Sequence, residues 1–235
     1  MHPDIKYTAN EQIFEQIDTA EKAYWFGFIA AEGCIELMKY NSKRLSITLA
    51  LRDKNHLEKF RNFMGSNAPI VEYEKNLFRQ APTCIFRICR TKIVDDLIKL
   101  GLRPNKSKNL TWPTMNDAFY ADFIRGFLDG DGSICVVQKK DRKGKPRCKR
   151  EYRMLFYSAS PNFLQSISEY IFHKLNIPLR KIRKVGRPSY STHGIDYGGR
   201  NHIEKILLYL FKNSNICLER KKTIIQEICH DSQII

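Results

Sequence analysis

Two acidic residues, each followed by glycine, end two similar segments of the sequence. Residues 25–33 read WFGFIAAEG and residues 124–132 read IRGFLDGDG, so Glu32 and Asp131 fill the same place. If each segment is a helix, its carboxylate falls at the C-terminus, where the helix dipole disfavours an anion by a few tenths to about 1 kcal/mol. Carboxylate oxygens bind hard divalent cations, so two acids at such places indicate metal-dependent chemistry.

Small residues inside the two segments indicate how the helices that carry these acids are placed. Gly27 and Ala31 are four residues apart and lie on one helical face, as do Gly126 and Gly130. Small residues at this spacing let two backbones approach closely, although a glycine within a helix costs about 1 kcal/mol relative to alanine. The pattern predicts that the two helices pack together and bring the two acids close. The glycine after each acid is expected in the left-handed conformation that ends a helix.

The two segments begin two copies of one order of elements. After the first, apolar periodicity predicts strands at 34–40 and 44–51, a helix at 54–64, strands at 70–74 and 84–89, and a helix at 91–100. After the second, it predicts strands at 133–137 and 152–158, a helix at 162–175, strands at 179–185 and 189–197, and a helix at 201–212. The expected fold class is α+β, with two pseudo-symmetric αββαββα half-domains joined through packed helices.

The boundary between the half-domains is expected at a stretch rich in Pro, Asn, Lys and Ser. Residues 102–113 have this linker-like composition, so the predicted half-domains are 1–113 and 114–235. Both acid-ended helices lie in one chain and no second copy is needed to complete the pair. The protein is therefore expected to be a monomer.

The charge balance favours a polyanionic partner. The 235 residues include 40 Lys plus Arg and 25 Asp plus Glu, a formal net charge of +15, and 43% are hydrophobic, which is enough for a substantial core. Neutralising phosphates with cations releases counterions and gains affinity, so this excess favours nucleic acid over a merely solvated basic surface.

Other classes of protein are not supported by the sequence. The seven cysteines form no CxxC pair and no zinc-like set, so they are expected to be reduced thiols. No apolar run approaches the roughly 20 residues of a membrane span, and the N-terminus lacks an apolar signal region. We expect an intracellular protein with no membrane association, in a bacterial, phage or organellar compartment.

Basic residues gather in the expected strands and in the turns between them. Residues 138–153 contain nine, and the sequence KGKP within them marks a turn whose tip fits a solvated loop equally well. The candidate DNA-binding residues are Lys39, Arg44, Arg79, Arg87 and Arg90 in the first half, and Lys139, Lys140, Arg142, Arg150, Arg153, Arg180, Lys181, Arg183, Lys184 and Arg187 in the second. The sequence leaves open which of them read bases and which hold phosphates.

The two acid-ended segments resemble the paired motifs of the LAGLIDADG homing endonucleases. Residues 124–132 are a close match. The first segment is more divergent, because Trp25 and Phe26 open it and Ala30 replaces the usual first acid, while Glu32 stands at the final acid. Together with the repeated element order, the resemblance covers essentially the whole chain; it includes residues 100–107 and 208–221, which resemble the ends of such domains.

The resemblance implies that the motif helices form the domain interface and that two saddle-shaped antiparallel sheets lie in the major groove of double-stranded DNA. A strand of about ten residues spans about 33 Å, close to the 34–36 Å of one DNA turn. Two such sheets would cover roughly two turns, so the expected site is long and mostly non-palindromic.

The resemblance also assigns chemistry to particular residues. It implies that metal-activated water attacks a scissile phosphate on each strand, with Mg²⁺ as cofactor, Mn²⁺ able to substitute, and Ca²⁺ supporting binding without cleavage. The implied catalytic residues are the metal-binding acids Glu32 and Asp131 and two assisting basic residues, Lys106 and Lys221, with Ala31 and Gly130 also at the metal sites. Plain phosphate or solvent contacts explain the two lysines equally well.

The expected function is that of a site-specific homing endonuclease making a double-strand break by metal-dependent phosphodiester hydrolysis. An intron maturase that binds RNA is an alternative, as is a sequence-specific DNA-binding protein with inactive motifs. An intein is not expected, because only 31 residues precede Glu32 and the sequence ends SQII rather than His-Asn.

Overall fold

The computed structural model describes residues 7–76, 80–104, 108–140, 146–186, 191–212, 214–230 and 234, without the side chains of 139–140 and 146–150. The chain forms two compact units. The first comprises Met1–Lys106 and Pro113–Phe127, and the second comprises Ser107–Trp112 and Leu128–Ile235. The expected halves 1–113 and 114–235 follow the sequence repeat and stay a prediction, whereas contacts group Pro113–Phe127 with the first unit.

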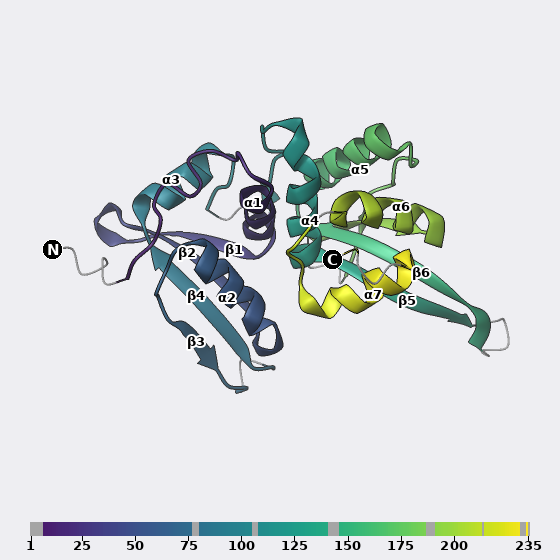
Figure 1. Cartoon of the computed structure of the whole chain (residues 1–235), viewed down its shortest axis with the longest axis horizontal. Helices are drawn as coiled ribbons and strands as arrows, with labels where there is room; N and C mark the ends of the chain where they lie inside the picture. Colours follow the sequence, from purple (N-terminus) through teal and green to yellow (C-terminus); the bar gives the residue numbers. More distant parts are fainter. Residues whose placement is uncertain are drawn as a thin grey trace. The chain divides into compact units, whose positions relative to one another are not determined.

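The first unit is built on a four-stranded antiparallel sheet with the order β1-β2-β4-β3 (Figure 1). Along the chain its elements are α1 (Ala20–Glu32), β1 (Gly33–Leu37), β2 (Lys43–Ala50), α2 (Lys54–Phe63), β3 (Ile70–Tyr73), β4 (Thr83–Cys89) and α3 (Thr91–Lys99). All three helices contact the sheet. A second stretch of the chain, Pro113–Phe127, adds most of helix α4 (Tyr120–Asp131) to this unit.

Alternation along β2 explains why this sheet has one face packed on helices and one polar face. Leu45, Ile47 and Leu49 are buried, and the residues between them point the opposite way because side chains alternate along a strand. Arg44 and Ser46 lie on that opposite face. The sheet therefore keeps a polar face that the helices of the unit do not use.

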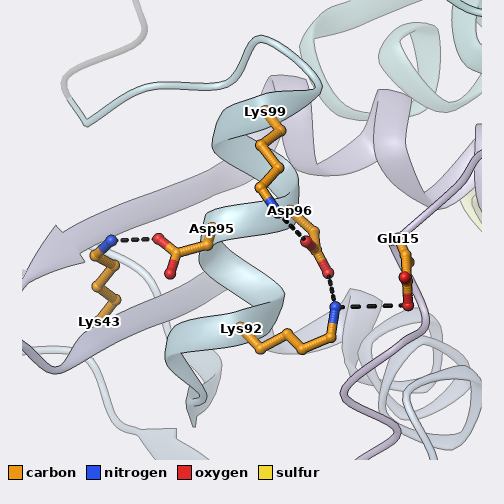
Figure 2. A network of polar contacts seen from close by, with 6 residues as sticks. All are labelled: Glu15, Lys43, Lys92, Asp95, Asp96 and Lys99. Carbon is orange, nitrogen blue, oxygen red and sulfur yellow. Dashed lines mark hydrogen bonds and ion pairs between the residues drawn. The ribbon is translucent and has the colours of Figure 1, made fainter.

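Ion pairs anchor α3 within the first unit (Figure 2). The Asp96 carboxylate is buried and binds the ammonium groups of Lys92 at 2.8 Å and Lys99 at 3.3 Å. Lys92 also lies 3.5 Å from a carboxylate oxygen of Glu15 in the N-terminal segment. Burial raises the pKa of Asp96, but the hydrogen bonds from Lys92 and Lys99 bring this pKa below its ordinary value.

The second unit repeats the same sheet, with the order β5-β6-β8-β7. Its elements are the end of α4 (Tyr120–Asp131), β5 (Gly132–Lys140), β6 (Pro146–Ser158), α5 (Pro161–Leu175), β7 (Arg183–Lys184), β8 (His193–Gly198), α6 (Arg200–Phe211) and α7 (Glu219–Cys229). The hairpin of β5 and β6 is paired as far as Lys140 and Pro146, well beyond Arg153–Ser158, the part of β6 that pairs with β8. No helix in the described residues is long and apolar enough to cross a membrane.

The expected α+β fold with a repeated αββαββα order is confirmed, with three differences in detail. Strand β6 begins at Pro146 rather than at 152, so basic residues expected in a loop belong to a strand. Strand β7 has only two residues, although a strand at 179–185 was expected. Helix α7 is an addition to the repeat; its buried residues include Ile225, Ile228 and Cys229.

Candidate functional site

The backbones of α1 and α4 touch at two glycines within the first unit. A Cβ atom added to Gly27 would lie 2.0 Å from the carbonyl oxygen of Phe123, and one added to Gly126 would lie 1.9 Å from that of Tyr24. The rings of Phe26 and Phe123 pack beside this contact with centroids 5.4 Å apart. Even alanine does not fit at either glycine, so this pair of helices depends on the small residues that the motifs supply.

A buried arginine lies at the same helix contact. The guanidinium of Arg125 is 5.1 Å from the centre of the Tyr24 ring and 2.7 Å from the carboxylate of Asp122. Burial raises the pKa of Asp122, and the positive charge of Arg125 opposes that rise. Arg125 thus belongs to the helix packing although it lies within the second motif.

Each motif helix continues directly into the first strand of a sheet. Helix α1 ends at Glu32 and β1 begins at the next residue, and α4 ends at Asp131 with β5 following in the same way. Glu32 is partly exposed and Asp131 is exposed. Both acids therefore lie at the junction of a helix C-terminus and a sheet, each where solvent can reach it.

The expected left-handed glycine after each acid is wrong. Gly33 has extended backbone angles, φ −71° and ψ 140°, and Gly132 is not among the glycines with positive φ in the described part of the chain. Space is the reason for glycine at these places. A Cβ at Gly33 would lie 2.6 Å from the carbonyl oxygen of Ile29, and one at Gly132 would lie 2.4 Å from that of Leu128. The chain leaves each helix so sharply that a side chain would strike the preceding turn.

The end of α4 is held by a buried lysine. The side chain of Lys221, on α7, is buried, and its ammonium donates to the carbonyl oxygens of Asp129 at 3.0 Å and Gly132 at 2.8 Å, and also to that of Leu128. These carbonyls lie at the negative end of the helix dipole, which a cation stabilises. The structure thus places Lys221 beside the junction that carries Asp131, bound to the backbone, and its catalytic role stays a prediction.

The divergence of the first motif at Ala30 has a structural explanation. The corresponding acid of the second motif, Asp129, is fully buried and accepts the backbone N–H of Leu218 at 2.9 Å, which fixes the segment before α7. Ala30 is buried as well. Because the Asp129 carboxylate binds the chain itself, its replacement by alanine in the first motif does not by itself remove a metal ligand.

The donor chemistry at the two helix ends fits a divalent cation shared with a substrate. No group of three or more His, Cys, Asp or Glu residues forms a metal cage in the part of the chain that the structure describes. Glu32 and Asp131 each offer carboxylate oxygens, and Ala31 and Gly130 directly precede them and are partly exposed. Hard cations such as Mg²⁺ take few protein ligands and complete their shell with water and phosphate oxygens. The residues present fit that kind of site.

The basic candidates fall into distinct groups in the structure. Five side chains are exposed, namely Lys39, Arg87, Lys181, Arg183 and Lys184. Three others are partly buried and contact protein groups, namely Arg44, Arg153 and Arg180. The remaining candidates lie outside the described residues, with Lys106, Arg79, Arg142 and Arg187 in undescribed segments and only the backbones of Lys139, Lys140 and Arg150 described, in β5 and β6.

The assignment of Arg90 as a DNA contact is wrong. Its side chain is only 8% exposed and lies 3.0 Å from the carboxylate of Glu11. It also donates to the carbonyl oxygens of Cys89, at 2.9 Å, and Tyr7. Arg90 ties the N-terminal segment to the end of β4, so its charge is used inside the protein.

Two acids that the sequence reading did not single out lie on the polar faces of the sheets. Glu36 on β1 accepts two hydrogen bonds from Arg44 through its two carboxylate oxygens, at 2.8 and 3.0 Å, and a third from the Ser46 hydroxyl at 3.4 Å. Asp196 on β8 forms an ion pair with Arg153. The contact between Glu36 and Arg44 could have been predicted from the sequence, because the two residues face each other in the β1–β2 hairpin. Asp196 could not, because it meets Arg153 only through the pairing of β6 with β8.

Comparisons with known proteins agree with this geometry. No protein-family model and no curated protein matches the sequence. Among solved structures, the I-SmaMI LAGLIDADG homing endonuclease bound to cleaved DNA is similar over 88% of this chain and 87% of its own, with a TM-score of 0.61 and 16% identity. The LAGLIDADG meganuclease I-AabMI bound to uncleaved DNA is similar over 90% of both chains, with a TM-score of 0.58 and 15% identity.

These similarities define the fold of the chain as that of the LAGLIDADG homing endonucleases. The resemblance drawn from the two motifs is therefore confirmed at the level of the fold. A further neighbour, I-SmaMI bound to an uncleaved DNA target in the presence of calcium ions, has a TM-score of 0.61 and 15% identity.

Proposed function

We propose that this chain is a site-specific homing endonuclease that makes a double-strand break in a long DNA target. The observation that carries the proposal is the repeated junction of an acid-ended motif helix with a four-stranded sheet. The polar face of each sheet holds arginines, and a DNA duplex is the partner that a net charge of +15 favours. The structural neighbours I-SmaMI and I-AabMI are themselves bound to DNA.

The proposed chemistry is hydrolysis of one phosphodiester bond on each strand. Glu32 and Asp131 would each supply oxygen ligands to Mg²⁺, with Ala31 and Gly130 beside them. When bound there, the cation lowers the pKa of a water molecule and neutralises charge on the attacked phosphate. The protein's part is to hold the two acids at fixed helix ends, where bound cations also relieve the unfavourable charge of a carboxylate.

A buried lysine keeps the end of α4 in place. Lys221 binds the carbonyl oxygens of Asp129 in α4 and of Gly132 at the start of β5, so the backbone on both sides of Asp131 is held. Lys106 is proposed to assist near the reacting phosphate or to contact the DNA backbone. Mn²⁺ is expected to replace Mg²⁺ in cleavage, and Ca²⁺ is expected to support binding without cleavage.

Cleavage of a randomised duplex library tests the proposal. The protein is incubated with the library in Mg²⁺, in Ca²⁺ and in a metal chelator, and the cut ends and bound fragments are sequenced separately. We expect one long, mostly non-palindromic site, cut on both strands in Mg²⁺ only. Specific binding in Ca²⁺ without cleavage in any metal would instead support an inactive DNA-binding protein, and the absence of any selected duplex would support an RNA-binding maturase.

A further inference from the structure

Two arginines occupy the same register position in the two sheets. In the first sheet, the third residue after the glycine that begins β1 is Glu36, and it pairs with Arg44 on β2. In the second sheet, the third residue after the glycine that begins β5 is Cys135, and it pairs with Arg153 on β6. The pairing on the other side of each arginine is also the same. Arg44 pairs with the last residue of β4, and Arg153 pairs with the last residue of β8.

Each arginine is held by a carboxylate, but from the opposite neighbouring strand. Glu36 on β1 binds Nε and Nη2 of Arg44 with both oxygens, whereas Asp196 on β8 binds Nη2 of Arg153. The hydrogen bonds that Arg44 donates to Glu36 lower the pKa of Glu36 and raise the pKa of Arg44. Both arginines stay accessible, with 26% and 36% of their side chains exposed.

The polar face around the second arginine forms a hollow of about 490 Å³. Arg153 and Asp196 line it, together with Arg180 and Lys181 from the segment before β7 and Arg183 at the start of β7. The ring of Tyr197 supports Arg180 at 5.1 Å from its guanidinium. A base edge that meets Arg153 would therefore be flanked by cations able to reach phosphates.

The geometry points to guanine as the group that these arginines recognise. The two bonds from Nε and Nη2 of Arg44 to Glu36 fix the plane of that guanidinium and leave the Nη1 side of the group to a second partner. Asp196 restrains Arg153 through one nitrogen, Nη2. Guanine presents two acceptors, O6 and N7, at matching spacing in the major groove, and a two-bond contact with arginine is the commonest specific contact there. A guanidinium without a fixed plane would suit a phosphate equally well.

We propose that Arg44 and Arg153 each read one guanine, in different halves of the DNA site, and that Glu36 and Asp196 are the positioning residues that orient them. The inference rests on the proposed DNA-binding function. The inference also predicts that the two halves of the DNA site differ in sequence beside these guanines. The first sheet places the basic Arg87 where the second sheet places the acidic Asp196, since Arg87 pairs with Ser46 and Asp196 with Leu155.

Selection of bound duplexes tests the assignment without depending on cleavage. Parent, Arg44→Ala, Arg153→Ala and Glu36→Gln proteins select from a randomised library in Ca²⁺, and Lys59→Ala, an exposed change on helix α2, is the matched control. Each arginine variant should lose a guanine preference at one position, in different halves of the site. Its affinity for the parent site should fall roughly 5- to 150-fold, the effect of one two-bond base contact.

The remaining variants separate orientation from simple loss of charge. Glu36→Gln should relax the same position as Arg44→Ala while its melting temperature stays near that of the parent, because an exposed ion pair contributes little stability. Lys59→Ala should select the parent site. If the arginine variants weaken binding to all sequences and keep both guanines, they hold phosphates and the inference fails. If the parent selects no duplex, the proposed function itself fails.

Discussion

Replacing Gly126 by alanine tests the helix contact on which the site depends. The new methyl group would lie 1.9 Å from the carbonyl oxygen of Tyr24 and 2.9 Å from the backbone nitrogen of Phe28, whereas ordinary contacts begin at 3.4 Å. Both neighbours are backbone atoms of α1, so no side chain can move aside and the helices must separate. Separation would also disturb the packing of Phe26 on Phe123.

The size of the effect follows from two opposing contributions. Overpacking a close contact costs about 1–3 kcal/mol, and the upper part of this range applies because backbone meets backbone. Alanine gains about 1 kcal/mol over glycine within a helix. The variant should therefore be about 1–2 kcal/mol less stable, which lowers the melting temperature of a chain of this length by roughly 2–8 °C.

Thermal unfolding followed by circular dichroism measures this change. Gly198→Ala is the matched control, because its methyl group would meet only the Arg153 side chain at 3.8 Å and should leave the melting temperature nearly unchanged. An exposed helical glycine would give the opposite sign, since alanine would then raise the melting temperature. An unchanged or higher melting temperature for Gly126→Ala would refute the close approach of α1 and α4.

Three further predictions concern charge. Affinity for the selected DNA site should fall about 10³- to 10⁵-fold between about 50 and 200 mM salt if six to ten phosphates are contacted, and a flat salt titration would contradict the polyanion interpretation of the +15 charge. The pKa of Asp96 lies below its ordinary value of 3.8, because the hydrogen bonds from Lys92 and Lys99 outweigh the effect of burial. The ionised carboxylate therefore stabilises the fold at pH values above 3.8. That contribution is lost as pH falls through the lowered pKa, so urea unfolding from about pH 7 to about pH 3 should show a smaller loss of stability in Asp96→Asn than in the parent; equal losses would contradict it. Lys221→Met should lower the free energy of unfolding by about 1–3 kcal/mol because it removes the donor to the α4 carbonyls, whereas Lys222→Met, on the same helix, should change it little; similar urea midpoints for both variants would contradict this cap.

Local patterns in the sequence were sufficient to predict the repeat. Helical spacing and strand alternation are properties of short segments, and they gave both sheets and the helices packed on them. The glycines of the motifs also predicted a close helix contact, because glycine within a helix needs a compensating use. The extra helix α7 was missed, although Lys221, Ile225 and Ile228 stand at helical spacing on its buried face.

Long-range contacts explain what the sequence could not show. Arg90 was expected to contact DNA because it is positively charged. The sequence does not show that protein groups neutralise this charge, since its partners Glu11 and Tyr7 are about eighty residues away in the chain. The same limit applies to Arg153, whose partner Asp196 is reached only through strand pairing. Only glycine fits after each motif acid because the chain turns sharply from helix to strand. The sequence of the segment does not specify the angle of that turn.

Cleavage and binding by Glu32→Gln and Asp131→Asn show whether Glu32 and Asp131 hold catalytic metal ions. On the selected site, each variant should lose cleavage in Mg²⁺ while binding in Ca²⁺ stays near that of the parent or improves. Each should also melt at the parent temperature or slightly above it, because the amide removes an unfavourable charge from a helix C-terminus. Cleavage by both variants at the parental rate in Mg²⁺ would contradict the assignment.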